Sequence, residues 1–167
     1  MNIIFNADEI FLVAERIEIN GEAFYLKAAE YTTHAPTQAI LRKLAAMEEA
    51  HLRTFAALRA QLKEQDRRAT AFDPTGDAEM YLAALADGRV FDLSDPTKRI
   101  TGSEPITDVL KIAIGFEKDS VAFYAGMLNI VPEELGKLRV ADIIKEEMRH
   151  VAILTKQLAY FEGNVQP

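Results

Sequence analysis

The 167-residue sequence contains no cysteine, which excludes disulfide bonds, thiolate metal sites and cysteine nucleophiles. It has no excess of positive charge either: 19 Lys and Arg residues stand against 26 Asp and Glu residues, a formal net charge of −7. Nucleic-acid binding needs a basic surface stripe, so we expect no nucleic-acid partner. No apolar run approaches the roughly 20 residues of a membrane span, so we expect no membrane association.

The N-terminal segment, MNIIFNADEIFLVAERIE, has no basic region and soon becomes acidic, unlike a secretory signal peptide. We therefore expect a cytoplasmic protein. Hydrophobic residues make up 49% of the chain and charged residues 27%, which is typical of a globular domain with one core. No linker separates two such cores, so residues 1–167 are expected to form a single domain.

Four segments have apolar residues at steps of three and four, which is the period of an amphipathic α-helix. Asn6 and Glu9 predict a capping box at the start of the first helix. Pro36 and Pro132 are residues favoured in a first helical turn, and Gly163 is suited to ending the last helix. The predicted helices cover about residues 7–33, 36–64, 105–131 and 132–161.

Short connections join the first helix to the second and the third to the fourth, so each pair should be antiparallel neighbours. The middle connection, about residues 66–104, is long and rich in turn-forming residues, with a short helix predicted at about 77–87. A connection of this length can return along the whole bundle and place the third helix parallel to the second. The sequence thus predicts an all-α fold, an antiparallel four-helix bundle with one long crossover containing a short helix.

The two halves of the chain repeat one pattern of acidic and aromatic residues. The segments IEINGEAFY and FEKDSVAFY each place a Glu six residues before a Phe-Tyr pair, and each half then contains a Glu-x-x-His motif. Glu48 follows Glu18 by 30 residues, and Glu147 follows Glu117 by the same 30. Helix pairs of equal length would bring these positions to the same height in the bundle.

The repeated residues lie on the apolar faces of the predicted helices, where acidic side chains are costly. Four converging carboxylates without cations would repel one another, whereas two divalent ions would offset their charge. Carboxylate and imidazole ligands without sulfur suit iron or manganese better than a structural zinc site. We expect two iron ions, with manganese as an alternative and zinc as an occupant of purified protein. The predicted metal ligands, with no catalytic residue beyond them, are Glu18, Glu48, His51, Glu117, Glu147 and His150.

Five further residues have two interpretations each. Glu22 is either a seventh ligand or, as we favour, a solvated acid or a neighbour of a ligand. Tyr25 and Tyr124 are either redox-active or, more simply, core aromatics with satisfied hydroxyl groups. Asp142 and Glu146 either orient a ligand histidine or, by a small margin, are surface acids.

The motifs IEINGEAFY, EEAH, FEKDSVAFY and EEMRH, in this order, resemble those of the rubrerythrin family of ferritin-like di-iron proteins. The resemblance covers the chain from Asn6 to Phe161. It implies a ferritin-like bundle with a bridged di-iron centre that reacts with hydrogen peroxide or dioxygen. Glu18 and Glu117 would match the lone helix ligands of the family, and the two Glu-x-x-His motifs would supply the other four.

Two departures from the family accompany this resemblance. Typical rubrerythrins end in a rubredoxin-like iron–cysteine domain that supplies electrons, so this cysteine-free chain would need an external electron-donor protein. Typical rubrerythrins also carry an extra acid one turn along the third helix. Ser120 and Val121 occupy that turn here, and Glu22 in the first helix is the only comparable acid.

Three functions are compatible with these observations. The leading one is a non-haem di-iron peroxidase or oxidase of rubrerythrin type, with a role in oxidative stress and a separate reductant. The second is a ferroxidase or iron-handling protein that feeds a mineral core or a partner shell. The third is a helical scaffold that metal stabilises without catalysis. Bundles of this kind often pair, so we expect a homodimer.

Overall fold

The computed structural model describes residues 6–64, 80–81 and 95–163. These residues contain helices and turns but no strand, as the sequence predicts. No helix among them has the length and apolarity that a lipid bilayer would require. The long helices are α1 (Ala7–Tyr31), α2 (Ala35–Ala60), α4 (Ile106–Met127) and α5 (Lys137–Phe161), and the short 3-10 turns are η1 (Pro96–Arg99) and η2 (Glu133–Leu135).

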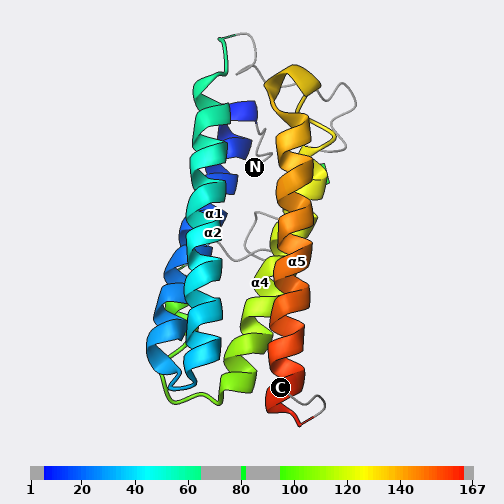
Figure 1. Ribbon diagram of the computed structural model, residues 1–167. Helices are drawn as coiled ribbons and strands as arrows, with labels where there is room; N and C mark the ends of the chain where they lie inside the picture. Colours follow the sequence, from blue (N-terminus) through cyan, green and yellow to red (C-terminus); the bar gives the residue numbers. More distant parts are fainter. Residues whose placement is uncertain (1–5, 65–79, 82–94, 164–167) are drawn as a thin grey trace.

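The four long helices form two antiparallel hairpins that lie side by side (Figure 1). One hairpin consists of α1 and α2 and the other of α4 and α5. Helix α2 ends at one end of the bundle and α4 begins at the opposite end, so α4 runs parallel to α2 (Figure 1). The predicted bundle topology is therefore confirmed. The short helix predicted at 77–87 lies outside the described residues except for Met80 and Tyr81, which are helical.

The first two helices begin with the residues that the sequence indicates. The capping box of α1 is present: the Glu9 backbone N–H donates to Asn6 Oδ1 and the Asn6 backbone N–H donates to Glu9 Oε2, both at 3.0 Å. Pro36 lies in the first turn of α2, where its missing N–H costs no helical hydrogen bond. Helices α1 and α2 end slightly earlier than predicted, at Tyr31 and Ala60.

The connection between α4 and α5 differs from the prediction. Helix α4 ends at Met127 instead of residue 131, and α5 begins at Lys137 instead of Pro132. Pro132 instead precedes the 3-10 turn η2, which ends at Gly136 in a left-handed conformation with φ of 96°. The Leu58 side chain packs against Gly136 so closely that a Cβ atom would overlap it. A residue of the other hairpin thus packs directly against the turn between α4 and α5.

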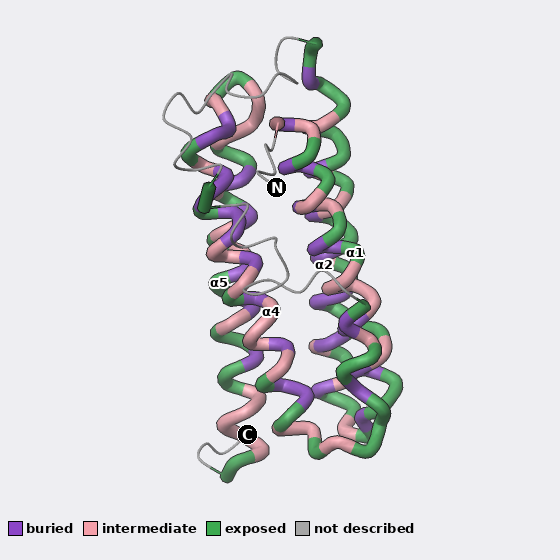
Figure 2. The backbone as a smooth tube through the Cα atoms, turned by 180° about the vertical axis from the view of Figure 1, so that it is seen from behind, coloured by how far each residue is buried: buried purple, intermediate pink, exposed green. Residues whose placement is uncertain are grey.

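Buried residues lie on the facing sides of the two hairpins (Figure 2). Their apolar side chains form two clusters, one toward each end of the bundle. Phe11, Phe55 and Met127 belong to the first cluster. Phe24 and Leu110 belong to the second. The buried glutamates and histidines of the four helices lie between the two clusters. The fold therefore encloses a polar layer between two apolar ones.

We expect Gly136→Ala to lower the free energy of unfolding by about 1–3 kcal/mol, because an L-residue is strained in this conformation. Its Cβ would also collide with Leu58. The matched control is Gly115→Ala within α4, where a Cβ meets nothing within 4 Å. This control should stabilise the protein by up to about 1 kcal/mol through helix propensity. Chemical denaturation would measure both changes, and equal effects of the two substitutions would contradict the prediction.

Candidate metal centre

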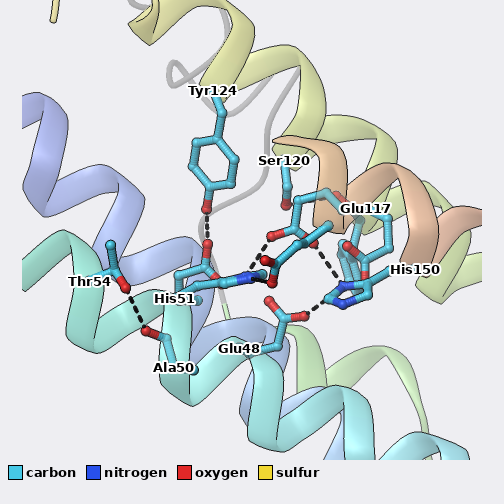
Figure 3. A network of polar contacts seen from close by, with 12 residues as sticks. Glu48, Ala50, His51, Thr54, Glu117, Ser120, Tyr124 and His150 are labelled. Carbon is cyan, nitrogen blue, oxygen red and sulfur yellow. Dashed lines mark hydrogen bonds and ion pairs between the residues drawn. The ribbon is translucent and has the colours of Figure 1, made fainter. Parts of the chain in front are cut away.

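Midway along the bundle, each long helix contributes one buried glutamate to a single polar cluster, and two buried histidines complete it (Figure 3). Helices α2 and α5 each place Glu and His one turn apart, so both side chains of each motif face inward. The structure therefore brings together all six residues of the repeated pattern. Their exposed fractions are 0% for Glu18, 4% for Glu48, 3% for His51, 3% for Glu117, 0% for Glu147 and 0% for His150.

The donor atoms fall into two overlapping groups, within each of which one atom from every residue lies within 4.8 Å of the others. The two groups have a glutamate from α2 and a glutamate from α5 in common. Two ions could therefore share both carboxylates, as in a bridged pair. The groups are the His51 position, formed by Glu18, Glu48, His51 and Glu147, and the His150 position, formed by Glu48, Glu117, Glu147 and His150.

Both imidazoles present Nδ1 to the centre of the cluster. His51 Nδ1 lies 2.9 Å from Glu147 Oε1 and 3.5 Å from Glu18 Oε2. His150 Nδ1 lies 2.9 Å from Glu147 Oε2 and 3.2 Å from Glu48 Oε1. The Nε2 atoms are the outer nitrogens, so each ring can bind an ion through Nδ1 and interact with the surrounding protein through Nε2.

The central donor atoms are close together but lack hydrogen-bond geometry. Buried polar atoms without a hydrogen-bond partner are rare and costly in proteins. Cations at the two positions would satisfy these atoms, so the residues fit a pair of divalent ions. Six central donor atoms are buried and have no hydrogen bond to any described residue: Glu18 Oε2, Glu48 Oε1, His51 Nδ1, both carboxylate oxygens of Glu147, and His150 Nδ1.

In the absence of cations, protons balance much of the negative charge. Burial opposes the charged form of His51, but the Glu147 and Glu18 carboxylates outweigh it and raise the pKa of this histidine to about 11. Burial likewise opposes a charged His150, yet Glu117 and Glu147 raise its pKa to about 12. Burial also raises the pKa of the Glu117 carboxyl to about 8. Metal binding must therefore displace protons from the cluster.

Two tyrosines connect the hairpins at the level of the cluster. The Tyr25 hydroxyl of α1 donates to Glu117 Oε1 of α4, and the Tyr124 hydroxyl of α4 donates to Glu18 Oε1 of α1. Burial raises the pKa of both phenols, so they remain protonated donors. The hydroxyl groups are satisfied, as we favoured from the sequence, but the sequence does not identify the acceptors. The sequence did contain a sign that the tyrosines belong to the site, since each follows a repeated Glu by two helical turns.

Of Asp142 and Glu146, the two acids of α5 with two interpretations, only Glu146 contacts the cluster. Glu146 Oε2 lies 3.0 Å from the outer nitrogen of His51, so our preference for a surface acid was wrong at this position. Asp142 is exposed and pairs with Lys145 at 2.8 Å, as a surface acid would. Glu22 is half-buried and belongs to neither metal position found among the described residues.

Gly21 is a further residue of the site that sequence reasoning missed. Glycine inside a helix costs about 1 kcal/mol relative to alanine, so a glycine in the middle of α1 needs a reason. A Cβ at this position would lie 3.1 Å from Glu48 Oε2 and 3.2 Å from Glu48 Cγ. The missing side chain of Gly21 therefore leaves the space that the Glu48 carboxylate occupies.

Comparisons with known proteins support the fold. The sequence matches no protein-family model and no curated protein. Among solved structures, the chain resembles a Thermotoga maritima protein described as a candidate ferritin-like diiron-carboxylate protein. The TM-score is 0.71 at 22% sequence identity, and the alignment covers 95% of this chain and 97% of the other. The chain thus has the fold of a ferritin-like four-helix bundle.

We expect Gly21→Ala to weaken metal binding by about tenfold or more, a loss typical of changes next to metal ligands. The added Cβ would press on Glu48, which belongs to both metal positions. Helix propensity alone should make the metal-free variant slightly more stable. Isothermal titration with Co²⁺ would measure the affinity, with Gly115→Ala as the control. A metal affinity equal to that of the control would contradict this role of Gly21.

The metal-free protein should lose stability as the pH rises. The pKa values of His51 and Glu117 are raised in the folded state, to about 11 and about 8, so their stabilising contributions are complete below the unfolded values of 6.5 and 4.5. Those contributions decline as the pH rises toward the folded values. Urea denaturation in the presence of a chelator should therefore give a lower free energy of unfolding at pH 9 than at pH 6. An increase over this interval would contradict the prediction.

Proposed function

We propose that this chain is a di-iron oxidoreductase of rubrerythrin type, which reduces hydrogen peroxide or dioxygen with electrons from an external donor protein. The observation that carries the proposal is the convergence of four buried glutamates and two buried histidines on two adjacent positions. Their central donor atoms lack hydrogen-bond partners among the described residues, as a site built for cations requires.

The composition of the cluster favours iron over a structural ion. Four carboxylates balance two divalent cations, and two neutral imidazoles add nitrogen ligands without changing the charge. Structural zinc sites are usually tetrahedral and rich in cysteine, whereas this cluster is rich in oxygen and shares two carboxylates between positions. The motif resemblance to rubrerythrins and the diiron description of the structural neighbour support the same choice.

Bound iron would supply two one-electron donors for cleavage of the O–O bond. The net reaction with peroxide consumes two electrons and two protons and yields two water molecules. With dioxygen it consumes four of each for the same two waters. The 167 residues contain no cysteine for an iron–cysteine centre, so an external donor protein supplies the electrons in this proposal.

The surrounding residues have distinct tasks in this proposal. Glu48 and Glu147 belong to both positions and would hold both ions. Tyr25 donates a hydrogen bond to one oxygen of Glu117, and Tyr124 donates one to an oxygen of Glu18. These bonds orient the two carboxylates and would leave the second oxygen of each for an ion. The apolar clusters on both sides of the polar layer limit the access of water.

We expect protein reconstituted anaerobically with two ferrous ions per chain to consume hydrogen peroxide faster than free iron does. Glu48→Gln should reduce the rate at least tenfold, because it removes a charge from a shared bridging ligand. The matched control is Glu49→Gln, since Glu49 is the exposed neighbour that pairs with Arg53. Peroxide consumption no faster than that of free iron would rule out the peroxidase.

Iron handling is a second candidate function, favoured by the ferritin-like description of the structural neighbour. A ferroxidase that feeds a mineral would take up many iron atoms per chain and form a large assembly. The proposed oxidoreductase would retain two iron atoms per chain in a homodimer. Size-exclusion chromatography combined with iron analysis separates these outcomes. A purely structural role would instead give equal stabilisation by redox-inert zinc and no reaction with peroxide.

A further inference from the structure

The chain repeats itself with a constant offset, and the repeat includes every metal-facing residue. Adding 99 to the residue number converts each predicted metal ligand of the first half, and the tyrosine that accompanies it, into its counterpart in the second. The ligands of the two halves are therefore equivalent in residue type, although Gly21 of the first half corresponds to Ser120 of the second. The matched pairs are Glu18 and Glu117, Tyr25 and Tyr124, Glu48 and Glu147, and His51 and His150.

The two ligand histidines differ in the contacts of their outer nitrogens. His51 Nε2 lies 3.0 Å from Glu146 Oε2 of the opposite hairpin. A carboxylate only accepts, so this contact keeps an imidazole proton on Nε2, and Nδ1 is the nitrogen that gives up its proton when an ion binds. His150 Nε2 is also buried but has no hydrogen-bond partner among the described residues.

The repeat identifies the residue that makes this difference. The counterpart of Glu146 in the first half is Met47, and both residues are half-buried. A thioether sulfur is a weak acceptor and carries no charge, so it cannot orient an imidazole as a carboxylate does. His51 is therefore fixed in tautomer and orientation by its outer contact, whereas no such contact fixes His150.

From this difference we infer that the two metal positions are unequal: the His51 position binds a divalent ion more tightly and fills first, with Glu146 as its positioning residue. The inference rests on the proposed two-metal function and extends it to the order of loading. Carboxylate partners of ligand histidines typically change metal affinity by 10- to 100-fold, so a difference of this size is expected.

The test is a titration of metal-free protein with Co²⁺, followed by calorimetry and by the visible absorption of the bound ion. Two ions that share carboxylates repel each other, so unequal binding steps alone would not support the inference. The informative variants give both halves the same residue at the positions of Met47 and Glu146. Glu146→Met should weaken the tighter step by 10- to 100-fold, and Met47→Glu should strengthen the weaker step by a similar factor.

The matched control is Asp142→Met, which removes an exposed acid one turn away on the same helix and should leave both steps unchanged. Glu146→Gln retains an acceptor oxygen and should restore most of the affinity lost in Glu146→Met. Nitrogen-15 spectra of histidine-labelled protein give an independent readout. One equivalent of Co²⁺ should perturb the His51 signals before those of His150, and zinc-loaded protein should show His51 protonated at Nε2.

Two results would overturn the inference while leaving the proposed function intact. The first is binding of two ions with a tighter step that Glu146→Met does not weaken beyond the effect of Asp142→Met. The second is equal perturbation of both histidines by the first equivalent of Co²⁺. Binding of fewer than two ions by the wild-type protein would instead contradict the proposed function itself.

Discussion

The rest of this structure depends on four carboxylates that are buried in the centre of a helical bundle. Glu18 and Glu147 are fully buried, in a setting where an unbalanced charge would oppose folding. Each surrounding feature reduces that cost. The histidines carry compensating protons when no cation is bound, the tyrosines donate hydrogen bonds, and the glycine beside Glu48 leaves space for its carboxylate. Burial of the two apolar clusters stabilises the fold and offsets the cost of burying the polar layer.

The same polar layer also favours one alignment of the four helices. A slip of one helical turn between the hairpins would place a glutamate against an apolar side chain and leave its former partner without a counter-charge. Such alternatives are disfavoured strongly because the desolvation of an unpaired carboxylate is costly. Polar residues that a uniformly apolar core would not need therefore help to define how the helices align.

Much of this arrangement could be predicted from the sequence because helical geometry is local and regular. The apolar period defines the helices. The shared 30-residue spacing places Glu18 and Glu48 at one height in their hairpin, and Glu117 and Glu147 at one height in theirs. What the sequence could not supply depends on contacts between hairpins. One example is the close packing of Leu58 against the left-handed turn at Gly136. The contact of Glu146 with His51 depends on how α5 is rotated against α2, which no pattern within one helix reveals.

The shared carboxylates have a consequence for the order of assembly. Glu48 belongs to the first hairpin and Glu147 to the second, and both metal positions need both residues. Neither hairpin alone can therefore offer a complete ligand set to either ion. Ion capture must follow the docking of the two hairpins, and a nascent chain that has made only its N-terminal half presents an incomplete site. Because Glu147 lies in α5, the last of the four long helices, neither position has its full ligand set before that helix has been made.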